Sequence, residues 1–211
     1  MQRLTCQLHL LNWSVYIVDK IILTDCDGVL LDWEVSFRAY AARQGYVFDK
    51  SHASSYSIGD QYGLTHAQSL DLISRFNHSS DFESLPPWRD AQEVVKLLVS
   101  EGWQLVVITT AGTHPWTYGL RMTNLENVFG KDAIRSLHIL PLHGDKGTEL
   151  VKYKDTGLYW IEDKLSNAEL GPWYGLNPLL MAADYNKNYV GPIPRVNTWQ
   201  DIYRIINDTV S

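Results

Sequence analysis

The stretch Ile21–Asp32 reads Ile-Ile-Leu-Thr-Asp-Cys-Asp-Gly-Val-Leu-Leu-Asp. Its opening apolar run has the length of a buried strand. Gly28 comes just after the run, and a glycine lets the backbone turn in ways that other residues avoid. Asp25 and Asp27 are therefore expected at the carboxyl end of a strand, where open α/β sheets bind ligands. Two neighbouring carboxylates repel each other unless a cation or a shared proton intervenes, and oxygen ligands beside a phosphate suit Mg²⁺.

Two plainer structures also contain an Asp-x-Asp-Gly sequence. A calcium loop needs acidic or amide groups at alternate positions, and Val29, Leu31 and Trp33 do not provide them. A turn without any function stays open as the other alternative. Asp32 is expected to cap or brace the turn rather than to contact a metal.

The composition limits the partners of this 211-residue chain, which is long enough for one domain with an insertion. The formal net charge is −6 and no basic run occurs, which argues against binding a nucleic acid polymer. A small anionic substrate is compatible, because a metal ion and one or two lysines would suffice locally. Cys6 and Cys26 offer no disulfide framework, which favours a cytoplasmic location. The chain contains no run of about 18 apolar residues, so the sequence predicts no membrane span.

Strand and helix patterns alternate along most of the chain, which predicts βαβ units, a mostly parallel sheet and an α/β fold. Residues 1–18 are interpreted as an extension that is not a signal peptide. Helical spacing begins at Trp33 and continues as a less regular helical pattern from about Gly45 to Pro87, with a capping-box spacing at 65–68. This segment is interpreted as an inserted cap. We expect further strands at 105–108, 137–142, 158–161 and 179–183, and helices beginning near Asp90 and covering about 116–129 and 199–206.

Polar residues come at the ends of three predicted strands. One more comes after a fourth strand, where the next helix begins. Because parallel strands end on one edge of a sheet, these residues should meet although they are far apart in the chain. They are Asp25 and Asp27, Thr109, Lys146, and the pair Glu162 and Asp163.

This combination of residue types suits phosphoryl transfer, in which catalysis depends mainly on the placement of charge. Asp25 is expected to attack phosphorus and to become an aspartyl phosphate. Asp27 would protonate the leaving oxygen and then take a proton from the water that hydrolyses the intermediate. Thr109 would donate a hydrogen bond to a phosphoryl oxygen, and Lys146 would bring positive charge to the phosphoryl group and to Asp25.

Glu162 and Asp163 are expected to complete the magnesium site, directly or through water. The alternative is that the pair caps a helix. Thr110 competes with Thr109 for the hydroxyl role, and Lys152 and Lys154 compete with Lys146. Those two lysines are expected on a solvated helix face. None of the seven histidines has a convincing metal-ligand spacing, although His114 and His143 fall near the predicted site.

The residues 25–29, Thr109, Lys146 and 162–163 resemble the four motifs of the haloacid dehalogenase-like superfamily of phosphatases. The resemblance covers nearly the whole chain from about Lys20. It implies a three-layer, Rossmann-like parallel sheet with a small helical cap inserted after the first core strand. The corresponding boundaries are an extension at 1–18, a catalytic core at 19–32 and 88–211, and a cap at 33–87.

The resemblance also assigns roles to single residues. It implies that Asp25 is the nucleophile and Asp27 the acid and base, and that Asp25, the backbone carbonyl of Asp27 and Asp163 hold Mg²⁺. Pump ATPases of the superfamily carry threonine at the position of Asp27 and keep their phosphoenzyme longer. The aspartate here therefore favours a phosphatase.

A closer likeness is to the 5′(3′)-deoxyribonucleotidases, through residues 27–34, 60–63 and 197–201. It implies that Trp33 stacks on a base and that Tyr56 lines the pocket. Gly28 and Thr110 are the other substrate-binding candidates. The chain departs from that family's pattern at Ser57, Glu162 and Lys164.

The sequence thus predicts a Mg²⁺-dependent phosphatase of small phosphomonoesters, with a (deoxy)nucleoside monophosphate as the expected substrate. One alternative is a phosphatase or phosphotransferase acting on sugar phosphates or other metabolites. Another is a phosphate- or nucleotide-binding module without turnover. The oligomeric state, including a homodimer, is left open.

Overall fold

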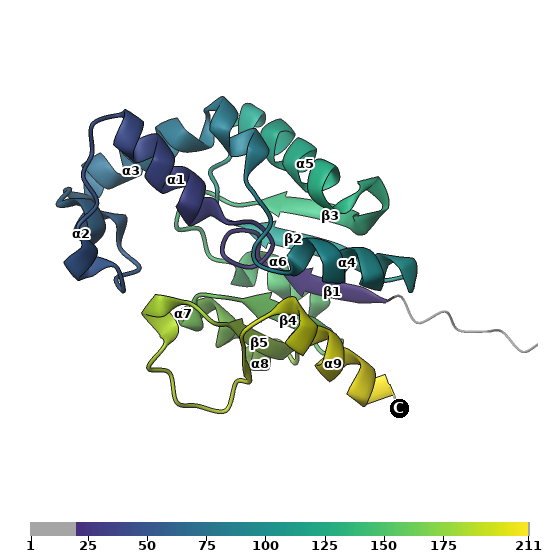
Figure 1. Cartoon of the computed structure of the whole chain (residues 1–211). Coiled ribbons are helices and arrows are strands. Elements are labelled where there is room, and N and C mark those ends of the chain that lie inside the picture. The colour runs from purple at the N-terminus through teal and green to yellow at the C-terminus, as the bar shows by residue number, and fades with distance from the viewer. Residues whose placement is uncertain (1–19, 211) are drawn as a thin grey trace, which may run out of the picture.

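A computed structural model of the chain describes residues 20–210 and contains a six-stranded sheet (Figure 1). All strand pairs are parallel, and the strand order is β3-β2-β1-β4-β5-β6. The predicted α/β fold with a parallel sheet is confirmed, whereas the predicted extension at 1–18 lies outside the described residues. The strands are β1 (Ile21–Thr24), β2 (Gln104–Thr109), β3 (Ile134–Ile139), β4 (Tyr159–Glu162), β5 (Asn177–Met181) and β6 (Arg195–Val196).

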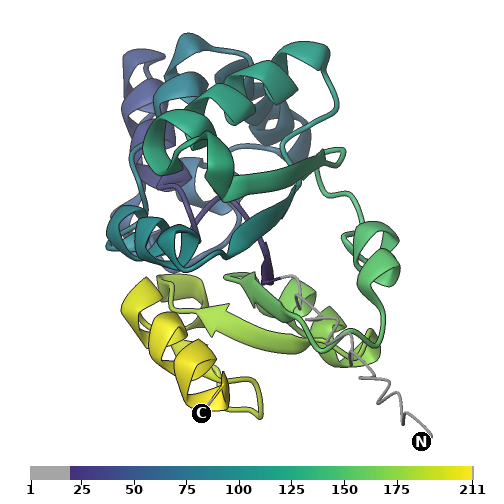
Figure 2. The ribbon, with the colours of Figure 1, turned by 90° about the vertical axis from the view of Figure 1, so that its right-hand side faces the viewer.

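Helices cover both faces of the sheet, which explains why the central strands read as continuous apolar runs. Neighbouring side chains of a strand point to opposite faces, so Ile22 enters one hydrophobic core and Leu23 the other. The larger core is covered by α4 (Ala91–Ser100), α5 (Pro115–Phe129) and α9 (Trp199–Val210). The other face carries the short helices α6 (Gly147–Leu150), α7 (Leu165–Ala168) and α8 (Leu170–Trp173). Figure 2 shows α4 and α9 on one side of the sheet and α6 on the other.

The segment between β1 and α4 is helical and lies at the end of the sheet toward which β1 points (Figure 1). It contains α1 (Trp33–Arg43), α2 (Ile58–Tyr62) and α3 (His66–Asn77), with the 3-10 helices η1 (Lys50–His52) and η2 (Ser80–Ser84). The predicted capping box of α3 is confirmed, with Thr65 and Gln68 as its two members. The expected cap at Asp32 is also confirmed, since its Oδ1 accepts a hydrogen bond of 3.0 Å from the Val35 N–H.

The predicted limits of two strands need correction. β5 covers Asn177–Met181 instead of 179–183. β3 covers 134–139 instead of 137–142, because it pairs with β2 from the Leu105–Ile134 level onward and Pro141 has no N–H for a ladder. The short strand β6 was not predicted. Within residues 20–210, no helix is long and apolar enough to cross a membrane.

Candidate active site

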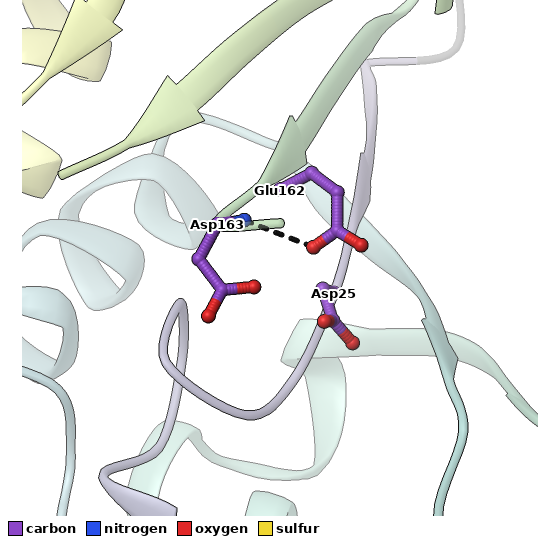
Figure 3. Close-up of side chains that lie close together, drawn as sticks. All are labelled: Asp25, Glu162 and Asp163. Carbon is purple, nitrogen blue, oxygen red and sulfur yellow. Dashed lines mark hydrogen bonds between the residues drawn. The ribbon is translucent and has the colours of Figure 1, made fainter. Parts of the chain in front are cut away.

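The sheet brings the predicted site residues to one edge. Asp25 directly follows β1, Thr109 ends β2, and Glu162 ends β4 with Asp163 next in the chain. Figure 3 shows that the carboxylates of Asp25, Glu162 and Asp163 point toward a common space. The strand pairing fixes this arrangement, since the Asp25 N–H donates a hydrogen bond of 2.8 Å to the Ile161 carbonyl of β4.

Lys146 enters the same place from the loop before α6 and is almost completely buried. Its Nζ lies 2.8 Å from Asp25 Oδ2 and 3.0 Å from Glu162 Oε1. Burial alone would favour the neutral amine, but the two carboxylates outweigh it and raise the pKa of Lys146 above its ordinary value. The lysine is therefore held as a cation against Asp25.

The three carboxylates form a group that could hold a metal ion. One oxygen from each of Asp25, Glu162 and Asp163 lies within 4.8 Å of the others, and all three residues are buried. Burial and then repulsion by Glu162 raise the pKa of Asp25 to about 7. Burial and then repulsion by Asp25 raise the pKa of Asp163 to about 6. Three carboxylates share one ammonium group, so the site has an excess of negative charge that a divalent cation would neutralise.

The two members of the Glu162–Asp163 pair have different surroundings. Glu162 Oε1 accepts hydrogen bonds from Lys146 and from the Asn167 side-chain amide, and its Oε2 accepts one of 2.9 Å from the Asp163 N–H. Asp163 Oδ2 accepts a hydrogen bond from the Tyr185 hydroxyl. Glu162 thus has most of its hydrogen-bonding capacity used within the protein, whereas Asp163 keeps one carboxylate oxygen available.

Gly28 is required beside this group for a steric reason. Its φ is +76°, and a side chain there would collide with the Asp163 carboxylate. The predicted turn after β1 therefore also leaves room for the carboxylate of Asp163, a candidate metal ligand.

Asp27 faces a different partner, Arg121 of α5. The two carboxylate oxygens lie 2.7 and 2.9 Å from Arg121 Nη2. Burial raises the pKa of Asp27 to about 6, although Arg121 opposes the shift. Arg121 was not predicted as a site residue from the sequence. The available signal was its helical phase, because Arg121 stands four residues before Leu125 and eight before Phe129, which are buried on α5.

A cavity of about 480 Å³ opens above these groups, which is within the range of small-molecule sites. Lys146 and Glu162 are not among its lining residues and lie beneath its floor. The predicted site residues that line it are Asp25, Asp27, Asp163, Thr109 and the four substrate-binding candidates Gly28, Trp33, Tyr56 and Thr110.

The aromatic candidates reach the cavity from the segment that precedes α4. Phe37 covers one face of the Trp33 ring, with centroids 4.3 Å apart, and the indole N–H donates a hydrogen bond of 3.1 Å to Asn77. Tyr56 is half exposed and makes an edge contact with Tyr185 at 5.1 Å. Lys164 Nζ lies 4.8 Å from the centre of the Tyr56 ring.

Of the competing candidates, Thr110 and His143 line the cavity, whereas the two lysines and His114 do not. Lys152 and Lys154 are exposed, and Lys152 pairs with Glu149 at 2.6 Å. His114 caps α5 by accepting a hydrogen bond from the Trp116 N–H. His143 lines the cavity but is not in the carboxylate group.

The sequence matches no family model and no curated protein. Solved structures do match the fold. A predicted phosphatase from Clostridium acetobutylicum superposes with a TM-score of 0.66 at 16% identity, covering 90% of this chain and 99% of that one. CbbY from Rhodobacter sphaeroides in complex with phosphate gives a TM-score of 0.59 at 14% identity, covering 87% and 96%. Magnesium-bound YfnB from Bacillus subtilis gives a TM-score of 0.55 at 13% identity, covering 90% and 99%.

At such identities the likeness shows the fold alone. The matching structures include haloacid dehalogenase-like hydrolases, phosphatases and dehalogenases. The described chain therefore has the α/β fold of the haloacid dehalogenase-like hydrolases.

Proposed function

We propose that the chain is a Mg²⁺-dependent phosphatase that hydrolyses small phosphomonoesters through an aspartyl phosphate on Asp25. The observation that carries the proposal is the environment of Asp25 at the floor of the cavity. Its carboxylate lies 2.8 Å from the buried Lys146 ammonium and within the group formed with Glu162 and Asp163. A nucleophile held beside fixed charges at the floor of a cavity is suited to phosphoryl transfer.

In the first step, an Asp25 carboxylate oxygen forms a bond to phosphorus while the bond from phosphorus to the leaving oxygen breaks. Asp27 gives a proton to that oxygen. In the second step, Asp27 takes a proton from water, which attacks phosphorus and releases Asp25. Lys146 compensates the negative charge near Asp25 throughout.

The residues suited to hold the metal ion are Asp25, Asp163 and the backbone carbonyl of Asp27. When bound, a magnesium ion supplies positive charge that lets an anionic substrate approach an anionic nucleophile. Glu162 is assigned to orient Lys146 and the Asp163 backbone, because its hydrogen bonds go to those groups.

The proposed substrate is a (deoxy)nucleoside monophosphate bound beneath a cap formed by residues 33–87. The support for this proposal is that Trp33 and Tyr56 line the same cavity as Asp25. Phe37 covers one face of Trp33, so a base would stack on the other. The remainder, 19–32 and 88–211, is the proposed catalytic core.

A sugar phosphate is the second candidate substrate. Ser55, Ser57 and Gln61 line the cavity beside the aromatic residues, and their hydroxyl and amide groups suit the hydroxyls of a sugar.

The test is phosphate release by the purified chain with Mg²⁺, from nucleoside monophosphates, sugar phosphates and p-nitrophenyl phosphate. We expect turnover that is lost with chelator and in the variant Asp25→Asn. Wild-type turnover in that variant would exclude Asp25 as the nucleophile. Sugar phosphates hydrolysed as well as nucleotides would exclude base stacking as the basis of selection.

A further inference from the structure

Arg121 is a completely buried cation whose charge is compensated at the active site. It lies on α5, and its guanidinium carbon is 3.9 Å from the centre of the Phe82 ring of η2. Within residues 20–210, Asp27 is the carboxylate that pairs with it. A buried arginine without further carboxylates is costly for a fold, so its presence beside Asp27 calls for a functional reason.

The geometry of the pair restricts Asp27. Arg121 Nη2 contacts both carboxylate oxygens, at 2.7 and 2.9 Å, while 28% of the Asp27 side chain stays exposed toward the cavity that it lines. The guanidinium itself is held by the Phe82 ring and by the helix. Rotation of the Asp27 carboxylate away from the cavity would break these contacts.

The other nitrogens of the Arg121 guanidinium have no partner among the described residues. Its Nε and Nη1 are buried without a hydrogen bond, as is the Thr117 hydroxyl one turn earlier on α5. The contact with Asp27 is therefore the polar interaction that the structure provides for this guanidinium.

We infer that Arg121 is a positioning residue that holds Asp27 at the leaving oxygen of the substrate. This inference rests on the proposed function, in which Asp27 exchanges protons with the leaving group and with water. Arg121 Nη2 donates to Asp27 Oδ2 and lies 2.7 Å from the buried Oδ1, so the contact fixes the orientation of the carboxylate relative to the cavity. When the proton donor is already held at the leaving oxygen, the proton-transfer step does not include the entropy cost of orienting it.

The inference predicts a dependence on the leaving group. When the bond to phosphorus breaks in an alkyl phosphomonoester, the leaving oxygen needs the proton of Asp27 to depart as an alcohol. The p-nitrophenolate ion departs without a proton. Losing the position of Asp27 should therefore slow the release of the leaving group far more for the alkyl ester than for the aryl ester, whereas hydrolysis of the aspartyl phosphate is common to both.

The test compares Arg121→Met and Arg121→Lys with the wild type, using glycerol 2-phosphate and p-nitrophenyl phosphate with Mg²⁺. General acid catalysis contributes a factor of at least about 10². We expect Arg121→Met to lower kcat/KM, which reports the step that releases the leaving group, about 10²-fold more for glycerol 2-phosphate than for p-nitrophenyl phosphate. Arg121→Lys should recover part of the loss because it keeps the charge.

Asn124→Leu is the matched structural control. Asn124 lies one turn further along α5 and joins it to Leu85, the residue after η2, through hydrogen bonds of 3.1 and 3.0 Å with the Leu85 backbone. Its loss should affect both substrates equally. Equal losses of kcat/KM for both substrates in the Arg121 variants, or no loss, would overturn the inference while leaving the phosphatase proposal intact. If Arg121→Met does not fold, the same ratio measured for Arg121→Lys decides. A wild-type chain without turnover would overturn both.

Discussion

Asp25 and Asp27 each pair with a buried cation, but the two cations differ in how many carboxylates they contact. Asp25 shares Lys146 with Glu162, so the lysine keeps a carboxylate if Asp25 is neutralised. Arg121 has Asp27 alone among the described residues. The two residues should therefore differ in how much the fold depends on them.

Replacing Asp27 by asparagine should destabilise the chain much more than replacing Asp25. Asp27→Asn leaves a buried guanidinium without its carboxylate, and breaking a buried pair in this way costs about 3–5 kcal/mol. Asp25→Asn removes one of three carboxylates that repel each other and should leave the free energy of unfolding near the wild-type value. Urea unfolding of both variants without metal measures the difference. Equal destabilisation would contradict the assignment of Arg121 to Asp27 alone.

Gly28→Ala should weaken magnesium binding as well as stability. A left-handed conformation costs a non-glycine residue about 1–2 kcal/mol, and the added methyl would displace the Asp163 carboxylate. The control is Gly102→Ala, because Gly102 has a φ of +90° but open space around its Cβ position. Thermal unfolding should show a lower stability for both variants. Only Gly28→Ala should need a higher Mg²⁺ concentration than the wild type for stabilisation by the metal. A similar magnesium requirement in both would show that Gly28 serves only the turn.

At the scale of elements, an aspartate predicted to start one helix also caps another. Asp90 precedes α4, and its two carboxylate oxygens accept hydrogen bonds of 2.9 Å each from the Trp199 and Gln200 N–H groups of α9. The α9 helix is held further by the Trp199 indole, which donates to the Val29 carbonyl in the loop after β1 at 2.8 Å. The last helix is thus attached directly to the loop that carries Asp27 and Gly28.

Asp90→Ala should therefore destabilise α9. Loss of an N-terminal cap costs about 0.5–2 kcal/mol, and here two N–H groups lose their acceptor. Asp132→Ala, at an exposed position of the 3-10 helix before β3, is the control and should be neutral. Hydrogen exchange of the first turn of α9, compared between the two variants, measures the effect. Unchanged protection in Asp90→Ala would show that the Trp199 contacts hold the helix without the cap.

The elements could be predicted from sequence where burial and local signals agree. The apolar runs of β1, β2 and β4, the Asp32 cap and the capping box of α3 depend on nearby residues. The limits of β3 and the existence of β6 depend on pairing with other strands, which no local pattern contains. Arg121 was missed for the same reason, because its partner is 94 residues away in the chain.

At the scale of the whole molecule, the sheet concentrates acidic groups at one buried edge. Asp25, Glu162 and Asp163 come from two neighbouring strands, and the lysine beside them compensates only one charge. Parallel pairing gathers these groups because all strands end on the same side. The stability of the metal-free protein should therefore depend on pH and on divalent cations.

The pH dependence follows from the pKa shifts. The pKa of Asp25 is raised to about 7 and that of Asp163 to about 6, both from an ordinary value of 3.8. Between about pH 4 and pH 7 the folded state binds more protons than the unfolded state, so these groups lower the stability as pH rises. The lowered pKa values of His78 and His143 act in the opposite direction. Comparing the wild type with Asp163→Asn separates the contribution of the carboxylates to the pH dependence of stability from that of the histidines.

Magnesium should reverse this loss, because it binds the ionised carboxylates. A ligand at about 100 times its Kd stabilises a fold by about 2.7 kcal/mol. Thermal unfolding of the wild type with MgCl₂, against NaCl of equal ionic strength, should show a larger stabilisation at about pH 7.5 than at about pH 5.5. In Asp163→Asn both the magnesium effect and the fall of stability with pH should shrink. A magnesium effect of the same size at both pH values, or one that survives in Asp163→Asn, would mean that the cation binds outside this carboxylate group.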